Sequence, residues 1–83
     1  MDSEFKKKDF LLLVGKQIDN IREEKGFSYE RISQGCTLDA SDISKIAKGR
    51  VNIMLSSVME LSKGLEIHPK ELFDFILDND DCM

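Results

Sequence analysis

Apolar side chains recur at intervals of three and four residues along most of the chain, the spacing of helices that bury one face. Glycines and capping residues divide this pattern into separate segments. The pattern predicts five helices, over residues 8–25, 29–34, 40–48, 55–63 and 70–77. We therefore expect an all-α, compact five-helix domain over residues 9–77. A charged lead-in (1–8) precedes it and an acidic flexible tail (78–83) follows it.

The same pattern predicts how the helices pack. Glycine inside the first helix, at Gly15, costs about 1 kcal/mol relative to alanine, so we expect a neighbouring helix to approach closely there. Gly64 is expected to end the fourth helix. The positions expected to face the core include Phe10, Ile18, Ile21, Ile32, Ile43, Ile46, Ala47, Leu55, Val58, Met59, Leu72, Phe73 and Ile76.

The two short helices carry start and stop signals. Ser28 and Asp39 can each N-cap one of them, because their side-chain oxygens accept free backbone N–H groups. Gly49 can close the second, since glycine adopts the left-handed conformation without strain. The exposed face of this second helix has short side chains first and lysines last: Ala40, Ser41, Ser44, Lys45 and Lys48. Such a face suits a DNA major groove, but an ordinary solvated helix has the same pattern, and both interpretations stay open here.

The order of these segments resembles the Cro/C1-type helix-turn-helix proteins, also called the XRE family. The family pattern is matched in turn by IREEKGFSYERIS, LDASDISKIAKGRVN and LSSVMELSKGLEIHPKELF. The match runs without a gap from Val14 to Phe73. The resemblance implies a lambda-repressor-like fold with the helix-turn-helix at helices two and three. It also implies a sequence-specific, DNA-binding transcriptional regulator whose third helix enters the major groove.

The resemblance assigns residues to roles on double-stranded DNA. The expected base contacts are Ala40, Ser41 and Lys45. The expected backbone contacts are Ser28, Tyr29, Ser44, Lys48, Arg50 and Asn52. One such module buries too little surface for tight binding alone, so we expect a homodimer on a palindromic site.

Three departures from the family pattern affect this assignment. Tyr29 stands where the family usually has glutamine. Its phenol either donates to a phosphate, which we prefer, or packs on the motif. Ala47 replaces a glutamate that often pairs with the arginine kept here as Arg22, so we expect Arg22 to find another carboxylate or solvent. Thr37 replaces a glycine in the turn and disfavours positive φ there.

The net charge of −4 over 83 residues argues against nucleic-acid binding. Its distribution weakens this objection, because residues 10–76 hold nine Lys and Arg against ten Asp and Glu. Three aspartates in residues 77–83 supply most of the excess. Lys6, Lys7 and Lys8 form the densest basic cluster. They are either an arm that touches DNA or a solvated helix lead-in, and we favour the lead-in because nearby acids neutralise them.

The remaining sequence features exclude other classes of function. Cys36 and Cys82 show no metal or catalytic spacing and are interpreted as a small buried side chain and a free thiol. The lone His68 is expected at a helix start. We predict no enzyme activity, cofactor, metal ion or small-molecule substrate, and no membrane span or signal peptide, hence a cytoplasmic protein. The alternative to DNA binding is a protein–protein interaction module on the same fold, which the acidic balance favours.

Overall fold

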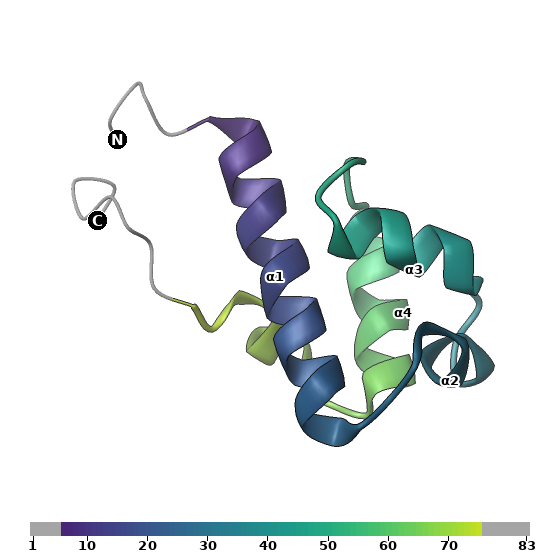
Figure 1. Ribbon diagram of the computed structural model, residues 1–83. Helices are drawn as coiled ribbons and strands as arrows, with labels where there is room; N and C mark the ends of the chain where they lie inside the picture. The colour runs from purple at the N-terminus through teal and green to yellow at the C-terminus, as the bar shows by residue number, and fades with distance from the viewer. Residues whose placement is uncertain (1–5, 76–83) are drawn as a thin grey trace.

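Helices account for all the regular secondary structure in the computed structural model, which describes residues 6–75 (Figure 1). Four are α-helices and the last is a 3-10 helix. Their bounds are α1 Lys7–Lys25, α2 Tyr29–Gln34, α3 Ala40–Ala47, α4 Leu55–Leu65 and η1 Pro69–Phe73. The prediction of an all-α fold is confirmed. The fifth α-helix expected over residues 70–77 is instead a short 3-10 helix that ends at Phe73.

Local signals set the ends of the first three helices. α1 closes at Gly26 in the left-handed conformation (φ 71°). The Ser28 hydroxyl caps α2 and the Asp39 carboxylate caps α3, as predicted. Gly49 follows α3 with φ 70°, and Thr37 is not among the described residues with positive φ, again as predicted. His68 is the N-cap of η1, which confirms its interpretation as a helix-start residue.

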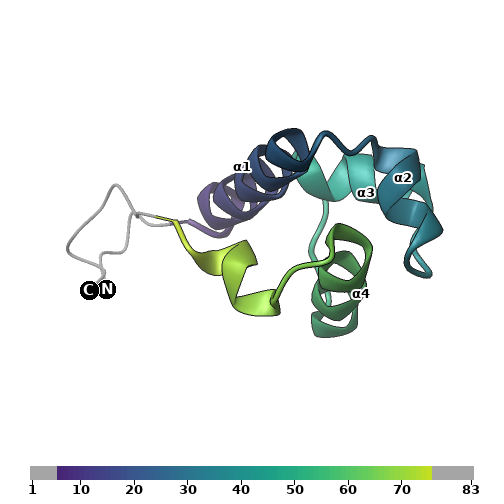
Figure 2. The same cartoon turned by 90° about the horizontal axis from the view of Figure 1, so that it is seen from below.

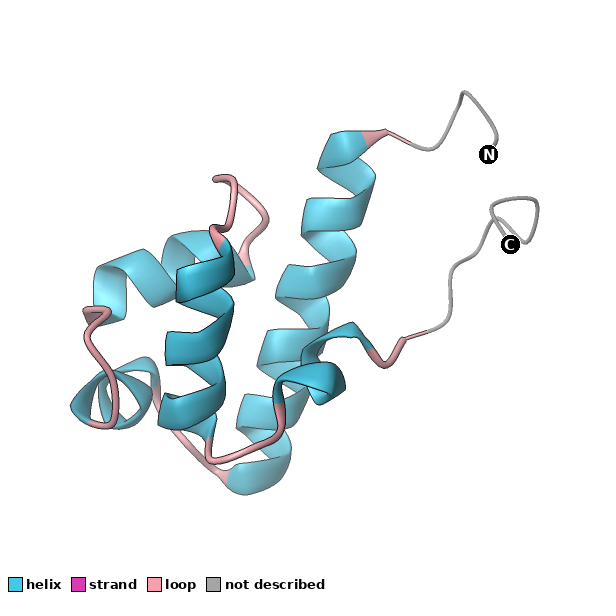
Figure 3. Ribbon diagram, turned by 180° about the vertical axis from the view of Figure 1, so that it is seen from behind, coloured by secondary structure: helices cyan, strands magenta, loops and turns pink. Residues whose placement is uncertain are grey.

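The core lies where α1, α3, α4 and η1 meet, with α2 closing one end (Figures 1 and 2). α1 packs against α3 and η1, while α2 packs against α3 and α4. Figure 3, which views the domain from behind, shows η1 lying against α1 beside the C-terminal end of α4. The fully buried side chains include Val14, Ile18, Ile32, Ile43, Leu61, Leu65 and Leu72.

Gly15 allows α1 and α3 to touch. A Cβ atom added there would lie 2.3 Å from the carbonyl oxygen of Ala47 and 2.8 Å from that of Ile46. No side chain fits at this separation, so the expected close approach is confirmed. It fixes the end of α3 against the middle of α1.

The predicted end of the fourth helix at Gly64 is wrong. α4 continues to Leu65, and Glu66 takes the left-handed position with φ 61°. Gly64 is instead a packing residue, because a Cβ there would lie 2.5 Å from the carbonyl oxygen of Ile32 in α2. Glycine is needed at this position for contact between helices and not for a turn.

Four residues predicted for the core are exposed: Leu55 is 85% accessible, Met59 50%, Phe73 42% and Phe10 37%. The buried stripe of α4 consists of Val58, Leu61, Ser62 and Leu65. Leu55 lies in the first turn and Met59 on the outer side of the helix, so neither meets the core. In η1 only Leu72 is buried. Phe75 packs against the core and makes an edge contact with Phe10, with ring centroids 6.0 Å apart.

Four expectations fall wholly or partly outside the described residues: burial of Ile76, the thiol of Cys82, the acidic tail at 78–83 and the first five residues of the charged lead-in at 1–8. Within the described part, no helix is long and apolar enough to cross a membrane.

Candidate nucleic-acid interface

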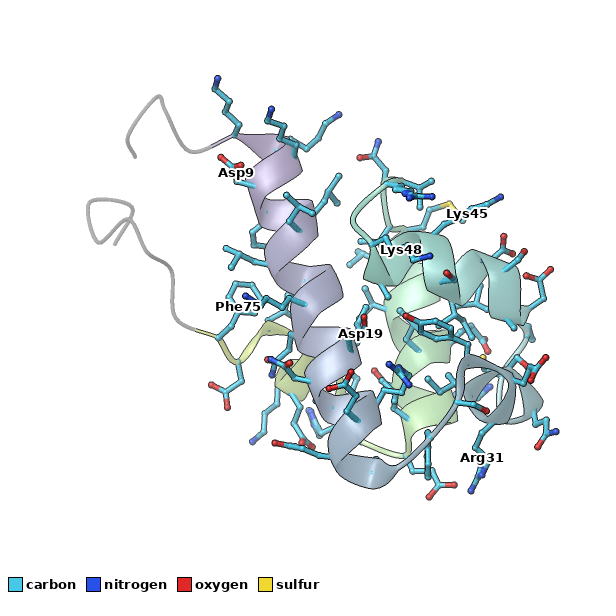
Figure 4. The ribbon with its side chains drawn as sticks, in the orientation of Figure 1. Asp9, Asp19, Arg31, Lys45, Lys48 and Phe75 are labelled. Atoms are coloured by element: carbon cyan, nitrogen blue, oxygen red, sulfur yellow. The ribbon has the colours of Figure 1, made fainter. Side chains whose placement is uncertain are left out.

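α3 presents its polar face to solvent. It buries Ile43, Ile46 and Ala47, while Ser41 and Lys45 on the opposite side are exposed. Figure 4 shows Lys45 and Lys48 projecting outward at this end of the domain. Of the nine residues expected to contact DNA, six are exposed: Ser28, Ser41, Lys45, Lys48, Arg50 and Asn52. The other three, Tyr29, Ala40 and Ser44, are half-buried. All nine are therefore accessible to a ligand.

The acid at the start of α3 is occupied within the protein. One carboxylate oxygen of Asp39 accepts the backbone N–H of Asp42 at 2.9 Å and the hydroxyl of Ser41 at 3.1 Å. The N–H of Asp42 and then the Ser41 hydroxyl hold the pKa of Asp39 below its usual value. Asp39 thus acts as a cap. Because the Ser41 hydroxyl donates its one hydrogen bond to Asp39, in this arrangement Ser41 can only accept a hydrogen bond from a ligand.

Ser28 has the opposite hydrogen-bonding capacity. Its oxygen accepts the backbone N–H of Arg31 at 3.0 Å. Since a hydroxyl has one hydrogen to donate and two lone pairs, the Ser28 hydrogen remains free for a phosphate oxygen. Capping and phosphate contact are therefore compatible at this residue.

The loop after α3 adds the exposed Arg50 to Lys45 and Lys48, and these three residues form a basic edge. Lys45 and Asn52 line one shallow depression together with Asp42, Ile46 and Val51. Lys45, Lys48 and Arg50 form no ion pair with any described residue. Three cations without an ion pair in the described part of the chain therefore lie along α3 and its following loop, although Lys45 also interacts electrostatically with Asp39.

Tyr29 has an internal partner that the sequence analysis missed. Its hydroxyl donates to a carboxylate oxygen of Asp19 in α1 at 2.9 Å. Burial, and then this hydrogen bond, raise the pKa of Tyr29 above its ordinary value of 10, so the phenol stays protonated. In the free protein the ring packs on the motif, and contact with a phosphate requires exchange of the hydrogen bond to Asp19.

The described residues hold no group of His, Cys, Asp and Glu side chains that could bind a metal ion. Cys36 is half-buried against the core, and its thiol lies 3.4 Å from the carbonyl oxygen of Ile32. The polar residues near α3 thus form a surface for hydrogen bonds and charge, with no arrangement for metal chemistry.

A family model for the Cro/C1-type helix-turn-helix DNA-binding domain matches residues 17–78, most of the chain. The chain belongs to the Cro/C1-type helix-turn-helix family. It is accordingly a DNA-binding transcription regulator with an all-α fold.

Two kinds of relative support this assignment. Control protein C.BamHI from Bacillus amyloliquefaciens is 37% identical over 65 residues, which cover 77% of this chain and 80% of that protein. The crystal structure of the restriction-modification controller protein C.AhdI from Aeromonas hydrophila matches with a TM-score of 0.73 and 31% identity, covering 77% of this chain and 97% of that one. The crystal structure of the wild-type restriction-modification controller protein C.Esp1396I matches with a TM-score of 0.70 and 33% identity, covering 77% of this chain and 83% of that one.

The departure from the Cro/C1-type pattern at Ala47 is compensated within α1. Arg22 donates from Nε to Asp19 at 3.0 Å and from one terminal nitrogen to the carbonyl oxygen of Phe27 at 3.0 Å. Its guanidinium also lies 4.7 Å from the centre of the Tyr29 ring. The prediction that Arg22 finds another carboxylate is confirmed. The Asp19–Arg22 spacing of three residues, which places both side chains on one helix face, is the signal that identifies this partner.

Proposed function

We propose that this protein binds a specific DNA sequence by placing α3 in the major groove, and that it controls a restriction–modification system. The main support is the exposed face of α3, where Lys45 and Lys48 form no ion pair with a described residue and Asp39 is occupied as a cap. C.BamHI is a control protein and C.AhdI a restriction-modification controller, which supports the second part.

We assign base recognition to Ala40, Ser41 and Lys45. The Lys45 ammonium can donate to guanine O6 and N7, and the Ser41 oxygen can accept from an amino group of adenine or cytosine. We assign positioning on the phosphates to Ser28, Tyr29, Ser44, Lys48, Arg50 and Asn52. These contacts carry no sequence information themselves, but they set the orientation of α3.

We also propose a two-fold dimer, because one module of this size buries too little DNA surface for tight binding. The exposed apolar side chains of Met54, Leu55 and Met59 supply a surface for a second copy. They lie at the start of α4, directly after the loop that follows α3. A symmetric contact there would fix the separation of the two α3 helices on a palindromic site.

Selection of bound duplexes from a random pool tests base recognition. The wild-type protein should enrich one palindromic motif. Lys45→Ala should change the preferred base at one position in each half-site, while Arg50→Ala should weaken all sequences alike. Lys70→Ala is the matched control, since η1 packs on α1 and α4, away from α3 (Figure 2).

Two outcomes would contradict the proposal. Enrichment of no motif at low salt would reject specific DNA recognition. Partners that remain bound after nuclease treatment, from a protein not retained on heparin, would favour the interaction module.

Leu55→Glu tests the dimer separately. This variant should reduce the mass measured in sedimentation to that of one chain, whereas an unchanged mass would reject the α4 surface.

A further inference from the structure

The start of α1 lies against the corner where α3 ends. A Cβ atom added at Gly49 would lie 2.8 Å from Cδ2 of Leu12 and 3.1 Å from its Cα. The two backbones are therefore in direct contact at this point. Figure 1 shows the first turns of α1 and the loop after α3 at the same end of the domain.

This contact places Lys8 beside the basic edge. Lys8 precedes Leu12 by four residues, so it lies on the same face of α1 and about 6 Å along the axis. It belongs to the helix, which begins at Lys7, and its side chain is exposed. Across the corner, Gly49 stands between Lys48 and Arg50 in the sequence.

Lys16 has the equivalent position on the other side of Leu12. It follows Leu12 by four residues and is adjacent to Gly15, whose backbone meets the carbonyl oxygen of Ala47. Its side chain is exposed. Neither Lys8 nor Lys16 pairs with a carboxylate of any described residue. The acid on the same face, Asp19, is already bound to Arg22 and Tyr29.

We propose that Lys8 and Lys16 extend the DNA contact surface from α3 onto α1. In this arrangement the phosphates that flank the groove occupied by α3 continue past the Leu12–Gly49 corner and meet both ammonium groups. Lys8 is then a phosphate contact and not a solvated lead-in, the interpretation that sequence alone favoured. This inference rests on the proposed binding of DNA through α3.

The dependence of affinity on salt provides the test. Binding to the selected duplex is measured at several salt concentrations for the wild-type protein, Lys8→Ala, Lys16→Ala and the double variant. Each lost phosphate contact should lower the slope of log affinity against log salt by about 0.9. Each should also weaken the selected and a scrambled duplex by a similar factor, roughly threefold to tenfold, without altering base preference.

Controls separate this inference from the function on which it rests. Lys70→Ala removes one charge from η1 and should keep the wild-type slope of log affinity against log salt. Lys8→Arg keeps the positive charge on α1 and should also show the wild-type slope. If the wild-type protein selects a motif but Lys8→Ala and Lys16→Ala match Lys70→Ala in slope, the α1 contact is rejected and the proposed function stands. If the wild-type protein selects no motif, the proposed function itself fails.

Discussion

α3 and α4 are neighbouring helices whose ends are set in different ways. α3 begins at a side-chain cap, Asp39, and is followed by a left-handed glycine, Gly49. α4 begins at Met54 with no side-chain cap and passes through Gly64, so that a non-glycine residue, Glu66, takes the left-handed position. Glycine therefore closes the helix proposed to read DNA, whereas in α4 the glycine serves contact with α2 and Glu66 takes the closing position.

The largest expected effect concerns this contact. Gly64→Ala should reduce the free energy of unfolding by about 3 kcal/mol, because the new methyl would lie 2.5 Å from the carbonyl oxygen and 2.6 Å from Cγ2 of Ile32, both in a packed core. Urea denaturation measures the change. The slope of the unfolding free energy against urea concentration should stay constant.

Gly26→Ala is the matched control for Gly64→Ala. Gly26 has φ 71° but no atom within 4 Å of an added Cβ, so only the backbone conformation opposes the substitution, at about 1 kcal/mol. Equal losses in the two variants would show that α4 moves away from α2 without penalty. Close packing against α2 would then not be the reason for glycine at Gly64.

The same contrast explains where sequence interpretation succeeded. The caps at Ser28 and Asp39 and the turn at Gly49 depend on residues within four positions of each other, so they are readable from the chain. The end of α4 could not be predicted from the local sequence, because Gly64 packs against Ile32, which is 32 positions earlier in the sequence. Leu55 and Met59 were misassigned for a related reason: their apolar character matches a core residue, but no helix of the described chain covers them.

The candidate site was partly predictable. Its nine residues follow from the family resemblance, and the structure leaves all of them accessible, but their contacts with DNA stay predictions. The bond from Tyr29 to Asp19 was missed because it joins residues ten positions apart in two helices. The position of Lys8 was missed because it depends on the contact between Leu12 and Gly49, which no local pattern records.

A smaller effect is expected at the cap of α2. Ser28→Ala should reduce the free energy of unfolding by about 1 kcal/mol, since the N–H of Arg31 would lose its acceptor. Ser28→Asp keeps an acceptor and should retain the stability. The Asp variant should nevertheless bind DNA more weakly, because it replaces a donor by an anion near the phosphates. Stability from urea denaturation and affinity from fluorescence anisotropy distinguish these roles, and parallel losses of both in the Asp variant would contradict them.

The smallest expected effect is a dependence of stability on acid, and it again contrasts α3 with α4. The N–H of Asp42 lowers the pKa of Asp39, and the N–H of Thr37, 3.0 Å away, lowers the pKa of Glu60 in α4. A carboxyl group with a folded pKa below its unfolded value stabilises the fold above the unfolded value, near pH 4. This stability disappears as the pH falls through the folded pKa.

Asp39→Asn and Glu60→Gln should therefore both flatten the loss of stability between pH 4 and pH 2.5, measured as the urea midpoint at each pH. At pH 7 they should differ. Asparagine still caps α3, so Asp39→Asn should leave the midpoint nearly unchanged. Glu60→Gln weakens a contact between α4 and the turn after α2 and should lower it slightly. If either variant loses its urea midpoint with acid as steeply as the wild-type protein, the carboxylate that it replaces does not link folding to pH. If Asp39→Asn lowers the midpoint at pH 7 more than Glu60→Gln does, the cap of α3 depends on the charge of Asp39.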